Sequence, residues 1–193
     1  PESYLWKVMA VGEGLPIAVM YFYEGNAEPD VDKEIAAFLS ITGQAAVAFF
    51  GGCCATQSKM TVVRGAGNIS TKQKFTNYQL HIEWQSPVEP ETLKSQGKGN
   101  SGVFMQGMYE VQVMNSYQNP TYRNGQAGAI YKQTPPLVNA TSKMGDWNTY
   151  DIIYTAPVFT TNGGIETPAY ITVIHNGIVI QNHTRIQGTT EYI

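Results

Sequence analysis

The chain has 193 residues, a length typical of one domain with a substantial core. Its net charge of -3 and its 14% of charged residues give no electrostatic basis for binding nucleic acid. Twelve Tyr, three Trp and nineteen Gly favour an all-β sandwich or barrel over a helical or α/β protein. The two cysteines, Cys53 and Cys54, are adjacent, so a disulfide framework is excluded and a zinc site lacks its second pair of ligands.

The first part of the chain contains one predicted strand and one long uncharged segment. Residues 1–15 are expected to be an N-terminal extension and residues 16–193 a single domain, with a strand at about Ile17 to Tyr23. No charged residue occurs between Ile35 and Ser58, and an apolar run of about 20 residues is long enough to span a membrane. Polar residues and glycines dilute this run. The sequence therefore leaves open a membrane-associated helix or a buried or irregular insertion near residues 31–57.

Two strands are predicted next, at Met60 to Arg64 and at Phe75 to Gln85. In the second, apolar and polar residues alternate, and a strand sends successive side chains to opposite faces. The apolar face, which is expected to lie in the core, consists of Tyr78, Leu80, Ile82 and Trp84. The polar face consists of Gln79, His81 and Glu83.

A hairpin with one polar face is predicted in the stretch from Gly99 to Tyr131. Asn100 to Gln106 and Tyr109 to Val113 read as two strands that a short Gly107-Met108 connection joins. In the second strand, Glu110 and Gln112 share one face, whereas the apolar residues, Tyr109 included, share the other. The polar face is therefore expected to be a binding face.

Three further strands are predicted at Trp147 to Thr155, Ala169 to His175 and Ile178 to Gln181. The last two are joined by Asn176-Gly177, the strongest short signal for a hairpin turn. His175 and His183 flank this hairpin and are expected at the surface.

Five separated motifs between about Gly67 and Thr190 resemble a known bacterial family, the 3-keto-disaccharide hydrolase domain. They are GNISTKQKFTNYQLHIEW, GKGNSGVFMQGMYEVQVMNSY, GQAGAIYKQTPPLVNA, GDWNTYDIIYTAPVF and PAYITVIHNGIVIQNHTRIQGTT. The resemblance implies an all-β, concanavalin A-like jelly-roll β-sandwich, in which two antiparallel sheets present a concave face to a sugar.

The resemblance also implies action on glycosides whose ring is oxidised to a ketone at carbon 3. Such a ketone acidifies the hydrogen on carbon 2, so a base can remove it and eject the group at carbon 1, after which water adds back. Glu110 is the candidate base, with His81 and Glu83, on a strand predicted to neighbour the hairpin, as candidate acid or ligands of a possible divalent metal. The candidate substrate-binding residues are Asn100, Gln112, Asn115, Tyr131 and Arg123.

Two departures from the family keep other functions open. Asn115 stands where the family usually carries an aspartate, and the chain ends at Ile193, before the family's closing strand. The chain is therefore expected to be an enzyme that cleaves 3-keto-glycosides, a non-catalytic module that binds a glycan, or an accessory subunit of a membrane-associated complex. In the last case residues 35–58 would contact a membrane or a protein partner. The expected location is the periplasm or cell envelope of a bacterium.

Overall fold

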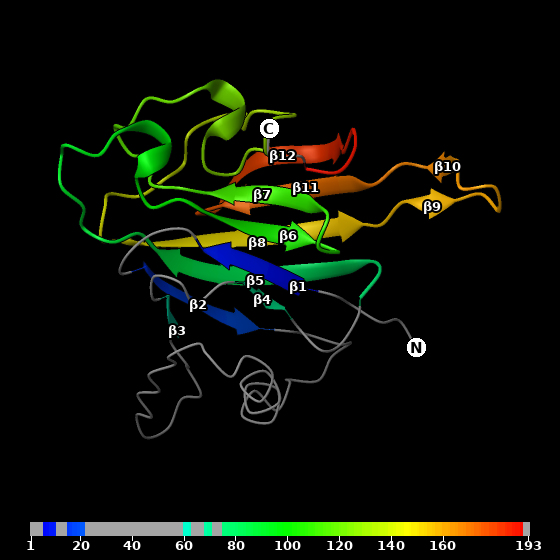
Figure 1. Ribbon diagram of the computed structural model, residues 1–193, viewed down its shortest axis with the longest axis horizontal. Coiled ribbons are helices and arrows are strands. Elements are labelled where there is room, and N and C mark those ends of the chain that lie inside the picture. Colours follow the sequence, from blue (N-terminus) through cyan, green and yellow to red (C-terminus); the bar gives the residue numbers. More distant parts are fainter. Residues whose placement is uncertain (1–5, 11–14, 22–59, 63–67, 71–74, 191–193) are drawn as a thin grey trace, which may run out of the picture.

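The computed structural model describes residues 6–10, 15–21, 60–62, 68–70 and 75–190, which form two antiparallel sheets packed face to face (Figure 1). One sheet has the order β4-β1-β6-β7. Its strands are Ile69–Ser70, Trp6–Ala10, Ser101–Met105 and Tyr109–Val113. The other sheet has the order β12-β11-β8-β5-β2-β3. Its strands are Ile178–Arg185, Tyr170–His175, Trp147–Thr155, Tyr78–Gln85, Leu15–Tyr21 and Met60–Val62.

The remaining elements are short. β9 (Val158–Phe159) and β10 (Ile165–Thr167) form a two-stranded hairpin that extends beyond the sandwich in Figure 1. Two 3₁₀ turns, η1 (Ser95–Gly97) and η2 (Arg123–Gly125), lie in the connections on either side of the β6-β7 hairpin. The architecture confirms the predicted all-β jelly-roll sandwich.

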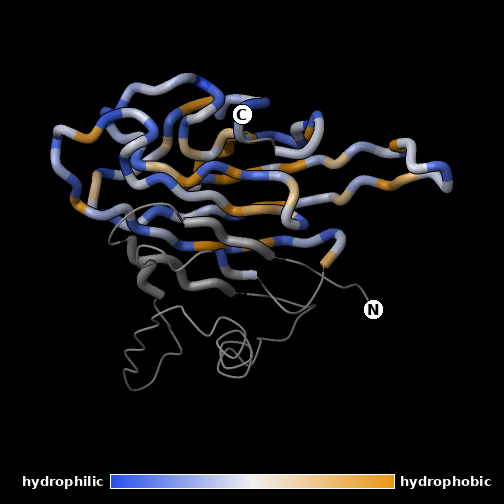
Figure 2. Tube along the Cα trace, in the orientation of Figure 1, coloured by the Kyte–Doolittle hydropathy of each residue, from blue (hydrophilic) through white to orange (hydrophobic). Residues whose placement is uncertain are grey.

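The core lies between the two sheets, where alternate side chains of facing strands meet. Tyr78, Leu80, Ile82 and Trp84 of β5 are buried, as the alternation predicts, and they pack with apolar residues of β6, β7, β8 and β11. The alternation is visible as blue and orange segments along these strands in Figure 2. β5 therefore also has an outward face, which carries its polar residues.

Several predicted features are confirmed and others are corrected. The predicted turn at Asn176-Gly177 joins β11 to β12, and both residues have the positive φ that a type I′ turn requires, 51° and 80°. The β6-β7 turn is centred on Gln106 and Gly107, with φ of 52° and 71°, one residue earlier than predicted. Trp6–Ala10, inside the stretch expected to be an extension, pairs with β6 along its whole length as β1.

The prediction that His175 lies at the surface is wrong, because it is fully buried against Trp84 and Tyr150. It ends β11 on the inward side, two residues after the buried Val173. The predicted insertion near residues 31–57, and with it the membrane-facing or partner-facing segment 35–58, lies outside the described residues. Among the residues that are described, no helix is long and apolar enough to cross a membrane.

Candidate active site

The outer face of the β6-β7 hairpin forms the floor of the candidate site. In the antiparallel register, Phe104 lies opposite Glu110 and Gly102 lies opposite Gln112. The alternate residues of both strands belong to the shared core, so these four point away from it. The sequence thus places a carboxylate and an amide side by side on one sheet face, as predicted.

Glu110 is held in place by its neighbours and is only 4% exposed. A Cβ at position 102 would overlap the Glu110 carboxylate and would lie 2.8 Å from its Cγ and from its Cδ. The backbone of Glu110 is bound on both sides: its N–H donates to Thr190 Oγ1 at 2.9 Å, and its carbonyl accepts from the Tyr131 N–H at 3.0 Å. Gly102 therefore provides the space in which the carboxylate lies.

The Gln112 amide connects Glu110 to the loop of η1. On one side it lies 2.8 Å from the Ser101 carbonyl oxygen and 3.2 Å from Glu110 Oε1, and on the other it lies 2.9 Å from Gln96 Oε1. Its single nitrogen can donate to one side only. We assign the nitrogen to Ser101 and Glu110, because a backbone carbonyl and an ionised carboxylate only accept hydrogen bonds. In that orientation Gln112 is a donor that positions the carboxylate.

Further amides surround this pair. The end of the Gln96 side chain lies 3.0 Å from Thr121 Oγ1 and 2.9 Å from the Gly125 carbonyl oxygen, so it ties the loop of η1 to that of η2. Asn100 Nδ2 donates to the Gln96 carbonyl at 2.9 Å. Amide groups both donate and accept, which suits the hydroxyl and carbonyl groups of a sugar.

Two tyrosines complete the site on its exposed side. The Tyr122 and Tyr131 hydroxyls are 2.6 Å apart, and Tyr122 is 42% exposed. The Tyr122 ring lies on Gly125, where a Cβ would come within 2.7 Å of its Cδ2. Burial, the bond to Tyr131 and the negative charge of Glu110 raise the pKa of Tyr122 above its ordinary value. Both phenols therefore belong to the surroundings of Glu110.

The structure separates His81 and Glu83 from this site. The prediction that their strand neighbours the hairpin is wrong, because β5 belongs to the six-stranded sheet and β7 to the other. The core side chains of β5 face β7, so His81 and Glu83 point outward on the opposite side of the sandwich. Strands that follow one another in the sequence of a sandwich often belong to different sheets. The alternation of residues within one strand does not indicate to which sheet the strand belongs.

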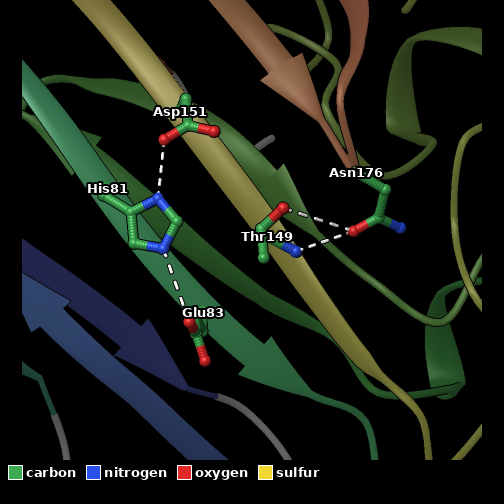
Figure 3. A network of polar contacts seen from close by, with 5 residues as sticks. All are labelled: His81, Glu83, Thr149, Asp151 and Asn176. Atoms are coloured by element: carbon green, nitrogen blue, oxygen red, sulfur yellow. Dashed lines mark hydrogen bonds and ion pairs between the residues drawn. The ribbon is translucent and has the colours of Figure 1, made fainter.

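On that opposite side, His81 lies between two carboxylates (Figure 3). Its Nδ1 is 2.6 Å from Asp151 Oδ1, across the β5-β8 pair, and its Nε2 is 3.5 Å from Glu83 Oε1. The three side chains keep between 29% and 49% of their surface exposed. Within the described part of the chain, no group of three or more His, Cys, Asp or Glu residues is arranged to hold a metal ion. The possible divalent metal stays a prediction.

The other two predicted residues lie at the edges of the site. Asn115 is 1% exposed and packs against Gly99. A Cβ added to Gly99 would lie 3.1 Å from the Cβ of Asn115 and 3.0 Å from the Cβ of Ser86. Its Oδ1 has no hydrogen-bond partner within the described residues. Arg123 is exposed in η2, directly after Tyr122. The structure thus brings together Glu110, Gln112, Asn100 and Tyr131.

Gln96 and Tyr122 are residues of the site that the sequence pattern does not indicate. Both lie in loops without periodicity, and chain folding alone brings them to the hairpin. The one available signal is composition, because glycines, amides and tyrosines cluster between residues 95 and 131.

Comparison with known proteins identifies the family. The model of the 3-keto-alpha-glucoside-1,2-lyase-like domain matches residues 39–193, most of the chain. The chain belongs to this family. The match includes every residue of the candidate site, so the carboxylate, amides and phenols described above form part of a domain of the 3-keto-alpha-glucoside-1,2-lyase-like type.

A solved structure supports the same assignment. The crystal structure of a protein from Parabacteroides distasonis, provisionally named a glycosyl hydrolase, is 60% identical to this chain, with a TM-score of 0.61. The alignment covers 64% of this chain and 52% of that protein, so it spans about half of the relative's length. The search of curated proteins gives no match.

Proposed function

We propose that this chain cleaves glycosides oxidised at carbon 3, by elimination followed by hydration, on the outer face of the β6-β7 hairpin. The observation that carries the proposal is the position of Glu110, a carboxylate buried over a glycine and oriented by the Gln112 amide. Membership of a family named for a lyase acting on 3-keto-alpha-glucosides supplies the class of substrate.

In the first step, Glu110 removes the proton on carbon 2, and the electron pair of the C–H bond forms an enolate with the carbon-3 ketone. The ketone then reforms as the bond from carbon 1 to the glycosidic oxygen breaks, which leaves a double bond between carbons 1 and 2. Water adds to carbon 1 and a proton returns to carbon 2, so the net reaction is hydrolysis. A base that is fixed before substrate binds lowers the barrier to the first step.

The surrounding amides have two roles in this proposal. Gln112 holds the carboxylate in one orientation, and the amides of Gln96 and Asn100 bind ring hydroxyls and the carbon-3 oxygen, where negative charge develops. The low exposure of Glu110 limits the access of bulk water during the removal of the carbon-2 proton. Residence in a bacterial periplasm or cell envelope, where oxidised glycosides would be met, remains part of the proposal.

The test is turnover of a 3-keto-disaccharide beside the unoxidised disaccharide, with the wild-type protein and with Glu110→Gln. We expect monosaccharide from the oxidised substrate only, and a loss in kcat of about 10²-fold or more in Glu110→Gln. His81→Gln, which changes the opposite sheet face, serves as the matched control and should retain activity. Binding of the 3-keto-disaccharide without turnover in the wild-type protein would instead favour a non-catalytic glycan-binding module.

A further inference from the structure

Tyr131 lies directly beside Glu110 on the outer face of the sheet. Val111 bridges to Ile130, and the Tyr131 N–H donates to the Glu110 carbonyl, so Glu110 and Tyr131 are opposite each other across an antiparallel pair. Residues opposite each other in such a pair have Cβ atoms about 5 Å apart and point to the same face. The carboxylate and the phenol are therefore positioned to contact one bound ligand from the same side.

Tyr122 contacts Tyr131 from the exposed side. Their hydroxyl oxygens are 2.6 Å apart, a short distance for a hydrogen bond between neutral hydroxyl groups. The Tyr122 ring is held by Gly125, because any larger residue at position 125 would collide with it. The pair is thus a fixed chain of two hydroxyls that runs from the surface to the neighbourhood of Glu110.

The site needs a group that protonates the glycosidic oxygen as it leaves carbon 1, because an alcohol leaves poorly as an alkoxide. Glu110 takes up the carbon-2 proton and cannot deliver another at the same moment. Burial, the bond to Tyr131 and the charge of Glu110 all raise the pKa of Tyr122, so its hydroxyl keeps the proton that it donates to Tyr131.

We propose that Tyr131 is the catalytic acid of this site and that Tyr122 is a positioning residue that donates to it. The inference rests on the proposed function. As the bond from carbon 1 to the glycosidic oxygen breaks, its electron pair stays on the oxygen, which takes the Tyr131 hydroxyl proton. The Tyr122 hydroxyl stabilises the resulting phenolate by donating a hydrogen bond. The water that enters the site after the leaving group has departed exchanges the proton held by Glu110, so carbon 2 receives a solvent proton from Glu110 as water adds to carbon 1, and the proton released by the added water restores Tyr131.

The experiment compares two 3-keto-glucosides with the same sugar and different leaving groups. One releases an alcohol, as in a 3-keto-disaccharide, and the other releases an acidic nitrophenol that leaves without protonation. For Tyr131→Phe we expect kcat/KM to fall by about 10²-fold or more on the disaccharide and by less than about 10-fold on the nitrophenyl substrate. Tyr122→Phe should show the same selectivity with a smaller loss. Tyr170→Phe, on the opposite side of the sandwich, is the control and should match the wild-type protein on both substrates.

Equal losses on the two substrates would overturn the proposal, because they would show that Tyr131 binds the sugar or supports Glu110 without acting as an acid. Unchanged activity of Tyr131→Phe on the disaccharide would also overturn it. Thermal unfolding of each variant separates these outcomes from loss of folded protein. The wild-type protein tests the proposed function independently: turnover of both substrates supports that function whichever result Tyr131→Phe gives.

Discussion

Acidification is predicted to destabilise the fold through His175. The ring is fully buried, its Nε2 lies 3.1 Å from Asn148 Oδ1, and its Nδ1 has no partner within the described residues. Asn148 Oδ1 is an acceptor, so the Nε2 atom of His175 carries the ring hydrogen and Nδ1 is unprotonated. Burial lowers the pKa of His175 from 6.5 to about 4, because a charged ring would lie without compensation in the core.

Stability falls with falling pH because the folded state favours the neutral form of His175. The stabilising contribution is complete above the unfolded-state pKa of 6.5 and is lost as the pH falls toward the folded-state pKa of about 4. Lowering the pH from 7.5 to 5 should therefore reduce the free energy of unfolding by about 2 kcal/mol through this one residue.

The assay is urea unfolding at several pH values for the wild-type protein, for His175→Gln and for His183→Gln. Glutamine at 175 keeps a donor for Asn148 and cannot titrate, so this variant should be less stable at pH 7.5 but should lose about 2 kcal/mol less between pH 7.5 and pH 5. His183 is exposed, and its variant should follow the wild-type curve. Parallel curves for the wild-type protein and His175→Gln would refute the reasoning.

Three further predictions concern other contacts. Gly102→Ala should fold but displace the Glu110 carboxylate and lower kcat by about 10²-fold in the turnover assay. The control is Gly188→Ala, whose added Cβ meets no atom within 4 Å, and it should match the wild-type protein. Full activity of Gly102→Ala would contradict the placement of Glu110. Asp151→Asn should change the free energy of unfolding by no more than about 1 kcal/mol and leave turnover intact, because its contact with His81 is solvent-exposed. Gln181→Leu should lower the free energy of unfolding in urea by about 1–3 kcal/mol. The Gln181 amide nitrogen lies 3.1–3.4 Å from three backbone carbonyl oxygens, and the substitution removes this donor. An unchanged urea midpoint would show that other donors bind these carbonyls.

Local pattern was sufficient to predict most of the strands and the floor of the site. The alternation in FTNYQLHIEWQ predicts which side of β5 is buried, and that in YEVQV places Glu110 and Gln112 on one face. Both predictions depend only on the two-residue period of a strand, which the chain carries locally. The same reasoning extended to Ile171, Val173 and His175 would have placed His175 in the core.

What the sequence could not indicate depends on contacts between distant residues. The assignment of β5 and β7 to different sheets separates His81 from Glu110, and nothing in either strand specifies its neighbours. Tyr122 reaches Tyr131 because the chain turns back after η2 and residues 128–131 pair with the edge of β7, in a loop without periodicity. β1 reads WKVMA and has only one polar residue, so it lacks the alternation of apolar and polar residues by which the other strands were recognised.

The most direct test of the proposed elimination is the fate of the hydrogen on carbon 2 during turnover in D₂O. Removal of this proton by Glu110 and later addition of water would leave a single deuterium at carbon 2 of the released 3-keto sugar, detectable by mass spectrometry and proton NMR. The same sugar incubated with Glu110→Gln protein provides the background of spontaneous exchange. The account predicts one deuterium per product molecule in the first turnovers of the wild-type protein. Product that keeps its original hydrogen at carbon 2 would contradict the mechanism, because the account requires this hydrogen to be removed and replaced from the solvent.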